Sequence, residues 1–139
     1  MKADVMENIV KNIEVVAAAI CQDGKVLAAQ RGYGEFKGGW EFPGGKIEPG
    51  ETQEQAIVRE IQEELAATIE VKEKIGTVEY DYPAFHLTMH CFWATVKDGE
   101  PKLLEHENAR WVDKNTIRTV GWLPADMELV EQVVKKLEV

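Results

Sequence analysis

The feature that most constrains this chain is the concentration of glycine in one segment. Seven of its eleven glycines lie within residues 32–50. Loops of this length inside a compact domain are usually either functional or disordered, and the aromatic residues Phe36, Trp40 and Phe42 favour order. We therefore expect an ordered loop, interrupted by a short Trp-Glu-Phe segment, between strands that precede it and a helix that follows it.

The helix after this loop has a clear beginning and a clear buried face. Thr52 is a suitable cap, because Gln55 three residues later completes a capping-box pattern. The apolar residues that follow recur at helical spacing and form one stripe, namely Ile57, Val58, Ile61 and Leu65. The pattern predicts an amphipathic helix that buries this stripe against the rest of the domain.

Strand patterns fill most of the remaining chain. They lie at residues 13–20, 25–31, 68–82, 86–96 and 109–112, with a turn at 22–24. A last helix begins near Pro124, a residue that suits the first helical position. Its predicted apolar stripe consists of Met127, Val130, Val133 or Val134, and Leu137. The order of strands, helix, strands and helix predicts an α/β fold in which helices cover the faces of a mixed sheet.

Length and charge exclude several classes of protein. At roughly 150 residues per domain, the chain is expected to form a single domain over residues 1–139. Its formal net charge of −9 argues against binding to a nucleic-acid polymer or an anionic membrane, because both need a positive face. An acidic protein can still bind a phosphate-rich small molecule when divalent cations mediate the contact.

No segment has the pattern of a membrane span or a secretory signal. The longest apolar run, near residues 15–21, is far shorter than the roughly 20 residues that a membrane helix needs. The first residues carry scattered charges and lack the apolar core of a signal peptide. Cys21 and Cys91 are far apart and lack a Cys-x-x-Cys spacing, so we expect no zinc site and a cytoplasmic location.

Three glutamates crowd one face of the predicted helix after the loop. Glu60, Glu63 and Glu64 are spaced i, i+3 and i+4, so their like charges repel unless a counter-ion binds. Oxygen ligands of this kind suit Mg²⁺, with Mn²⁺ as a substitute. Most glutamate-rich helix faces are merely solvated, but here a glycine-rich loop and Glu51 at the helix entry precede the cluster.

The spacing in this region resembles the Nudix box of the Nudix hydrolases. The resemblance covers residues 45–67 and rests on Gly45, Glu51, Arg59, Glu60, Ile61, Glu63 and Glu64. The run WEFPGGKIEPGE, Arg31, Glu105 and the LPAD sequence before the last helix resemble the MutT-like branch, which includes 8-oxo-dGTP diphosphatases and CTP pyrophosphohydrolases. This similarity spans roughly residues 13 to 135. It implies the Nudix α/β/α sandwich, with a mixed sheet between helices.

The resemblance also implies an activity and its alternatives. A MutT-like enzyme would hydrolyse a nucleoside triphosphate with Mg²⁺ to a monophosphate and pyrophosphate, and would cleanse the nucleotide pool of 8-oxo-dGTP-like species. One alternative is a CTP or 5-substituted dCTP pyrophosphohydrolase. Another is a non-catalytic Nudix-like module that senses a nucleotide. The oligomeric state is left open between a monomer and a homodimer.

The site residues implied by the resemblance fall into two groups. Metal ligands would be Glu60, Glu64 and the Gly44 carbonyl, with Glu63 supporting the same or a second ion and Glu105 arriving from a distant loop. Glu60 and Glu105 are both candidates for the catalytic base. Glu51 would orient Arg59 or hold outer-shell water.

On the substrate side each predicted role has an ordinary structural alternative. Arg31 would contact phosphate, and Glu41 would face the nucleoside, but both could be solvated surface charges. Tyr82 and Phe85, with Tyr80, could line a base pocket or pack in the core. Asp126 could read the base, as an acceptor for cytosine N4 or as a protonated donor to 8-oxoguanine, or could favour the helix dipole.

Two further features of the sequence have consequences that a structure can test. His86 and His90 alternate onto one strand face, where satisfied or exposed histidines are commoner than zinc ligands. Ala66 and Ala67 stand where the family has a glycine and an aliphatic residue. Glycine there would supply a left-handed helix cap. Alanine would cost about 1 kcal/mol in that conformation, unless the helix ends differently.

Overall fold

A computed structural model describes residues 11–138 of the chain, and the expectation that the chain has no signal peptide lies largely on residues outside this part. The elements in chain order are β1 (Lys11–Gln22), β2 (Lys25–Arg31), β3 (Trp40–Glu41), β4 (Gly44–Lys46), α2 (Gln53–Leu65), β5 (Thr68–Tyr82), β6 (Phe85–Asp98), β7 (His106–Val112), a 3₁₀ turn (Ile117–Thr119) and α3 (Pro124–Leu137). Among these residues no helix is long and apolar enough to cross a membrane.

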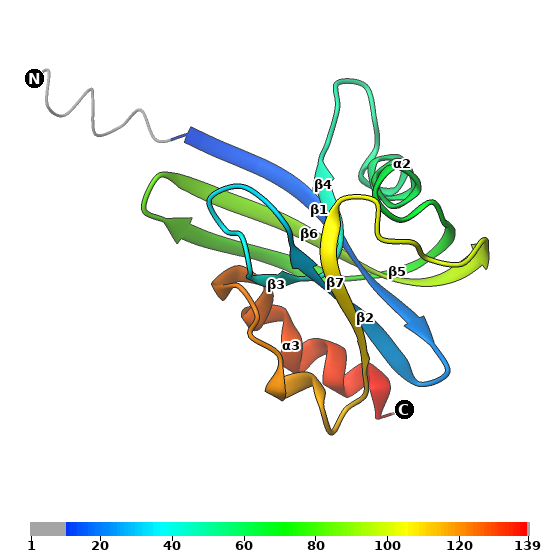
Figure 1. The fold of residues 1–139 in the computed structure, drawn as a ribbon. Coiled ribbons are helices and arrows are strands. Elements are labelled where there is room, and N and C mark those ends of the chain that lie inside the picture. Colours follow the sequence, from blue (N-terminus) through cyan, green and yellow to red (C-terminus); the bar gives the residue numbers. More distant parts are fainter. Residues whose placement is uncertain (1–10, 139) are drawn as a thin grey trace, which may run out of the picture.

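The sheet is mixed, as the sequence predicted, and it contains all seven strands of the described residues (Figure 1). β1 and β6 run parallel at its centre, from Lys11 beside Phe85 to Cys21 beside Thr95. The other pairings are antiparallel, and the order β3-β2-β1-β6-β5 is completed by β4 beside β1 and β7 beside β2. β7 therefore brings the segment after Glu105 alongside the strand that ends at Arg31.

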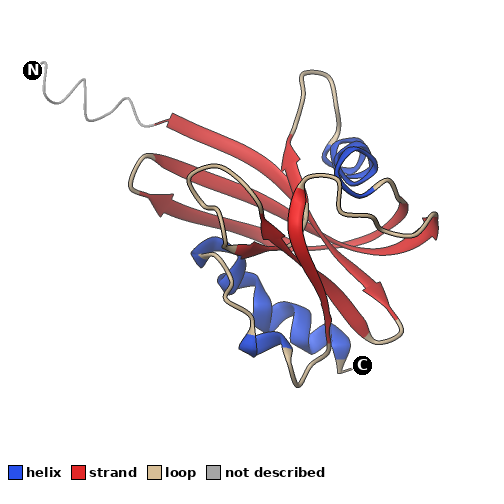
Figure 2. Ribbon diagram, viewed as in Figure 1, coloured by secondary structure: helices blue, strands red, loops and turns tan. Residues whose placement is uncertain are grey.

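The two long helices cover opposite faces of the sheet, which gives the predicted α/β/α sandwich (Figure 2). Alternation along β1 sends Val16, Ala18 and Ile20 towards α2, while Ala17 and Ala19 face α3. The predicted stripe of α2 is buried at Ile57, Ile61 and Leu65, and Val58 is partly buried against it. The buried face of α3 is formed mainly by Leu129, Val130, Val133 and Val134.

Two expectations about local structure are wrong. Met127 was placed on the buried stripe of the last helix, but it is 47% exposed, because Ala125, Leu129 and Val133 at spacing i+4 set the inner face instead. Residues 44–46 were expected to be loop but form β4 against β1. Gly44 allows this pairing, because a Cβ there would overlap the Val16 carbonyl oxygen.

The ends of α2 follow the sequence signals. Thr52 and Gln55 form both hydrogen bonds of the capping box. The helix ends at Ala66, which adopts the left-handed conformation with φ of 53° and donates its N–H to the Gln62 carbonyl at 3.1 Å. Alanine therefore takes the conformation that a glycine would take here. Cys21 and Cys91 are both free thiols.

Candidate active site

A pocket of about 370 Å³ lies beside the edge of α2 and brings together nine of the residues predicted for the site. These are Arg31, Glu41, Gly44, Glu60, Glu64, Tyr82, Phe85, Glu105 and Asp126. We call the part lined by Glu60, Glu64 and Glu105 the acidic side. We call the part lined by Phe36, Tyr82, Phe85 and Asp126 the aromatic side.

The acidic side brings carboxyl groups from α2 and from the segment before β7 into one pocket. Glu60 and Glu64 project from one face of α2, and the Glu64 residue is only 6% exposed. Burial raises the pKa of Glu64 to about 10, and its hydrogen bond with Glu60 and the charges of Glu60, Glu41 and Glu105 push in the same direction. A bound cation would stabilise the ionised form of Glu64 and lower its pKa towards the ordinary value.

The residues on the acidic side fit a hard divalent cation. All the available donors are oxygens, which Mg²⁺ and Mn²⁺ prefer. A Cβ on Gly45 would overlap the Glu60 carboxylate, so the glycine lets the backbone approach this group closely. Within residues 11–138 no group of three or more His, Cys, Asp or Glu side chains has the geometry of a metal site. Mg²⁺ is commonly held by one or two protein carboxylates together with water and substrate phosphates.

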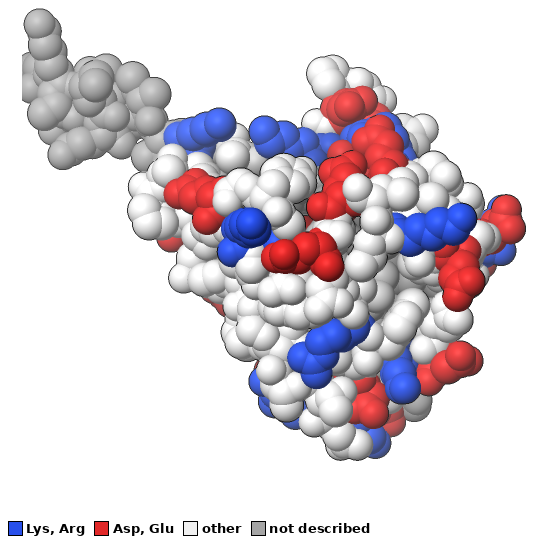
Figure 3. Space-filling view, in the orientation of Figure 1, with Lys and Arg blue, Asp and Glu red and all other residues white. Residues whose placement is uncertain are grey.

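Arg59, Glu51 and Glu63 lie beside the pocket and form a network around the Arg59 guanidinium. Its Nε lies 2.6 Å from Glu51 Oε2, and its Nη2 donates to Glu51 Oε1 at 2.9 Å. Its Nη1 donates to Glu60 at 2.9 Å and to the more exposed Glu63 at 3.1 Å. The hydrogen bonds with Glu51 raise the pKa of Arg59 and lower that of Glu51. Figure 3 shows acidic side chains gathered over the region of α2.

Arg31 and Glu41 form an ion pair between the two sides of the pocket. Arg31 Nη1 donates to Glu41 Oε1 at 3.1 Å, and His106 Nε2 lies 2.9 Å from Glu41 Oε2. Glu41 was predicted to face the nucleoside. It does line the pocket, but both of its oxygens are already engaged by protein donors. Tyr33 also reaches the acidic side, where its hydroxyl lies 3.4 Å from Glu105 Oε1.

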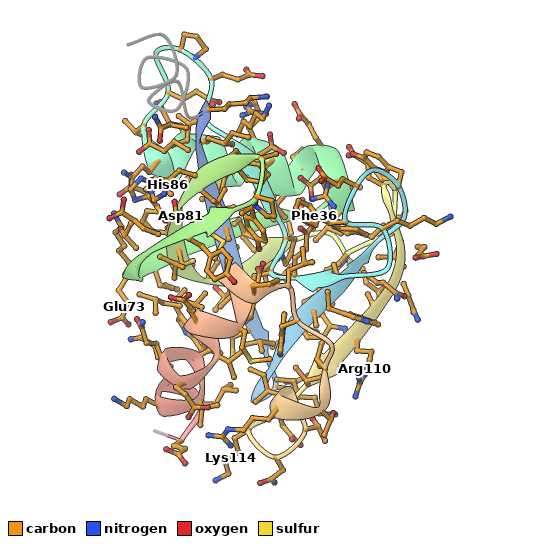
Figure 4. The ribbon with its side chains drawn as sticks, turned by 90° about the vertical axis from the view of Figure 1, so that its left-hand side faces the viewer. Phe36, Glu73, Asp81, His86, Arg110 and Lys114 are labelled. Atoms are coloured by element: carbon orange, nitrogen blue, oxygen red, sulfur yellow. The ribbon has the colours of Figure 1, made fainter. Side chains whose placement is uncertain are left out.

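The aromatic side is assembled from the β2–β3 loop, the β5–β6 hairpin and the first turn of α3. Phe36 packs against Tyr82 with ring centroids 5.0 Å apart, and Tyr82 against Phe85 at 5.2 Å. Figure 4 shows Phe36 lying between its own loop and this hairpin. The Tyr82 hydroxyl accepts a hydrogen bond from Ala125 N at 3.1 Å, which ties the hairpin to the start of α3. Tyr80 packs against Tyr82 and the core and does not line the pocket.

Asp126 is fixed in the pocket wall. Its Oδ1 accepts a hydrogen bond from the Phe42 N–H at 2.9 Å, and the residue is only 5% exposed. Burial raises its pKa well above the usual value, and the negative charge of Glu41 adds to this effect. The residue thus stands in the first turn of α3 and also presents a carboxyl group to the pocket.

The histidines that the sequence singled out lie away from the pocket, whereas His106 lines it. His86 Nδ1 lies 2.6 Å from Asp81 on the β5–β6 hairpin (Figure 4), and His90 Nε2 lies 2.6 Å from Glu14. No sequence motif indicated His106, and its position directly after Glu105 was the one available clue. Its contact with Glu41 depends on the pairing of β7 with β2, which sequence patterns do not reveal.

Comparison with known proteins shows the family of this chain. The NUDIX domain matches residues 11–133. The chain belongs to the Nudix family. It is 38% identical over 122 residues to the CTP pyrophosphohydrolase of Escherichia coli K12, covering 87% of this chain and 90% of that protein. It is 41% identical over 87 residues to the 8-oxo-dGTP diphosphatase of Proteus vulgaris, covering 61% and 78%.

Solved structures place the chain among the same proteins. The MutT NUDIX hydrolase from Burkholderia pseudomallei superposes with a TM-score of 0.78 at 28% identity, covering 88% of this chain and 98% of that one. The chain is therefore a Nudix hydrolase that acts on nucleotides. Nudix hydrolases generally need a divalent metal, and the oxygen donors of the acidic side suit that requirement.

Proposed function

We propose that this Nudix hydrolase is a Mg²⁺-dependent nucleoside triphosphate pyrophosphohydrolase that cleanses the cytoplasmic nucleotide pool of 8-oxo-dGTP-like species. The observation that carries the proposal is the composition of one pocket. It joins buried helix carboxylates, an arginine and an aromatic surface with a buried carboxyl. A triphosphate chain needs the first two, and a nucleobase needs the third.

Different residues of the pocket would bind the cation and the phosphate chain. Glu60, Glu64, the Gly44 carbonyl and Glu105 would hold the cation, with Glu63 in support. When bound, the cation neutralises phosphate charge and lowers the pKa of a coordinated water. Arg31 binds phosphate oxygens, a task that suits a guanidinium.

Proton transfer needs one further group. Glu60 and Glu105 are the two candidates for the base that accepts a proton from the attacking water. Glu51 keeps Arg59 in place against Glu60, because it holds two nitrogens of that guanidinium at 2.6 and 2.9 Å. Arg59 in turn limits where the Glu60 carboxylate can lie, through the contact at 2.9 Å.

The environment of Asp126 is compatible with an oxidised guanine as the base. Its raised pKa increases the protonated fraction, and its Oδ1 is already occupied by the Phe42 N–H. A protonated Oδ2 then donates to an acceptor on the base, as 8-oxoguanine provides. The second candidate is CTP or a 5-substituted dCTP, because an ionised Asp126 would accept from cytosine N4. The similarity to the relative named CTP pyrophosphohydrolase, which covers 87% of the chain, supports this second candidate.

A substrate panel tests the proposal. The purified protein is given 8-oxo-dGTP, dGTP, CTP, dCTP and 5-methyl-dCTP with Mg²⁺ or Mn²⁺, and products are separated by chromatography. We expect equimolar monophosphate and pyrophosphate, with the highest kcat/KM for 8-oxo-dGTP. A preference for a cytosine nucleotide would select the second candidate. Release of orthophosphate and a diphosphate would contradict the proposed site of attack. Binding without any turnover would support the nucleotide-sensing alternative.

A further inference from the structure

We infer that His106 is a positioning residue that commits Glu41 to the Arg31 ion pair and keeps it out of the metal cluster. The inference rests on the proposed function, since it assigns Arg31 to the substrate and Glu64 to the cation. His106 is the first residue of β7 and pairs across the sheet with Arg31. Its side chain is 4% exposed, and that of Glu41 is 14% exposed.

The geometry decides which ring nitrogen carries the hydrogen. His106 Nε2 lies 2.9 Å from Glu41 Oε2 and 3.8 Å from Glu64 Oε1. The nearer neighbour, Glu41 Oε2, is a carboxylate oxygen and accepts a hydrogen bond when ionised, so Nε2 is the donor to it in either charge state of the ring. The shorter distance is a hydrogen bond, whereas 3.8 Å is too long for one. The N–H is therefore given to Glu41, and Glu64 is left for a cation.

The His106 side chain lies between two carboxyl groups of the pocket, because its Nε2 is within 4 Å of both Glu41 and Glu64. Arg31 holds one oxygen of Glu41 and His106 holds the other. Without the His106 donor, Oε2 of Glu41 is free to turn towards the same cation as Glu64. Arg31 would then lose the partner that orients it towards the substrate.

A second observation indicates that this arrangement is prepared for a ligand. Within residues 11–138, the buried side-chain atoms that lack a hydrogen-bond partner are Arg31 Nε and His106 Nδ1. They belong to residues that face each other across β2 and β7. Buried polar atoms are rarely left unpaired, and exceptions concentrate where a water or ligand completes the network. Both exceptions in the described chain flank Glu41, which lines the pocket.

The first test compares His106→Leu, His106→Gln and the control His90→Leu. His90 is also a mostly buried histidine whose Nε2 lies against a carboxylate, but it is outside the pocket. We expect His106→Leu to raise KM about tenfold and change kcat by less than about threefold, because the lost contact orients a substrate-binding group. His106→Gln places an amide N–H near the Nε2 position and should restore KM. His90→Leu should leave KM unchanged.

The second test asks whether His106 acts through Glu41. In a Glu41→Ala background, His106→Leu should have almost no further effect on KM, since coupled residues are non-additive. Mn²⁺ affinity of the nucleotide-free protein, measured by electron paramagnetic resonance, should be unchanged or tighter in His106→Leu. Additive losses, weaker Mn²⁺ binding, or a His106→Gln protein as impaired as His106→Leu would each overturn the inference.

Two further measurements keep the inference separate from folding and from turnover. If circular dichroism shows that His106→Leu is unfolded, His106→Asn replaces it, because its shorter amide cannot reach Glu41. Binding of an α,β-methylene nucleoside triphosphate repeats the comparison without hydrolysis. If the wild-type protein hydrolysed none of the nucleotides, the proposed function would be contradicted. If the effects of His106→Leu and Glu41→Ala on nucleotide binding were additive, only the role of His106 would be contradicted.

Discussion

The acidic and aromatic sides of the pocket differ in how far the protein alone satisfies them. On the acidic side, Glu64 is buried beside other carboxylates and its pKa is raised to about 10. On the aromatic side, the Tyr82 hydroxyl and Asp126 Oδ1 each accept a backbone N–H, and the rings pack on one another. On the first side the ionised form of Glu64 is unfavourable unless a cation binds, whereas the second side is already formed by the protein alone. Substitutions should therefore lower kcat on the acidic side and change KM or base preference on the aromatic side.

The largest effect is expected from neutralising the helix carboxylates. Glu60→Gln and Glu64→Gln should each lower kcat by roughly 100-fold or more, because each removes a charge that supports the transition state through the cation. Steady-state kinetics over a range of Mg²⁺ concentrations measure the loss. Asp126→Asn is the matched change of an acid to its amide on the aromatic side. Full activity in both glutamate variants would contradict the metal assignment.

The Glu64→Gln variant also tests the raised pKa of Glu64, through the pH dependence of stability. The pKa of Glu64 is raised in the folded protein, so its contribution to stability is fully present below the ordinary value of 4.5 and is lost as pH rises towards about 10. Without metal, Glu64→Gln should therefore melt at a higher temperature than the wild type at pH 8, and the difference should vanish near pH 4. Thermal unfolding followed by circular dichroism measures it. A variant that melts lower at pH 8 would contradict the raised pKa.

The next prediction compares two adjacent glycines, Gly44 and Gly45, at which an added Cβ would meet different parts of the protein. A Cβ on Gly45 would meet the flexible end of the Glu60 side chain, whereas a Cβ on Gly44 would meet the backbone of Val16 and Ala17. Gly45→Ala should thus displace Glu60 and lower kcat by about tenfold or more, with the fold retained. Gly44→Ala should cost about 3 kcal/mol of stability, as overpacking does. Urea unfolding and kinetics on both variants separate the outcomes, and equal effects on stability would contradict this distinction.

What the sequence could predict follows from how each side is built. Glu60 and Glu64 lie on one helix, where spacing alone places them on one face, whereas Glu105 was expected beside them only because of the family resemblance. β4 was missed because glycine has low strand propensity, and only the close approach of Gly44 to Val16 explains its pairing. His106 was missed because its contact with Glu41 joins β7 to β3 across β2, an arrangement that local patterns do not encode.

A change of base preference is expected on the aromatic side. Asp126→Asn keeps an oxygen for the Phe42 N–H and replaces the other oxygen by a donor. KM for 8-oxo-dGTP should stay within about threefold, whereas a cytosine nucleotide that needs an acceptor should lose about 1–3 kcal/mol of binding. Asp126→Ala removes both functions and should raise KM for all bases. Equal losses of activity on every base in Asp126→Asn would show that the residue only supports the start of α3.

The smallest effect should come from the end of α2, which supports the acidic side without entering it. Ala66 has a φ of 53°, a conformation that costs a non-glycine residue about 1–2 kcal/mol. Ala66→Gly should remove this cost. Because glycine is also more flexible in the unfolded chain, which offsets part of the effect, the net stabilisation should be about 0.5–1 kcal/mol. The hydrogen bonds from Lys102 N to Leu65 O and from Leu104 N to Glu64 O involve neighbouring residues and should persist. Because these bonds anchor the segment that leads to Glu105, kcat and KM should not change.

Urea unfolding of Ala66→Gly and of the wild type measures the gain in stability. A loss of stability would show that the strain at Ala66 is already relieved by its surroundings, and a change in kcat would show that the helix end helps to place the catalytic carboxylates.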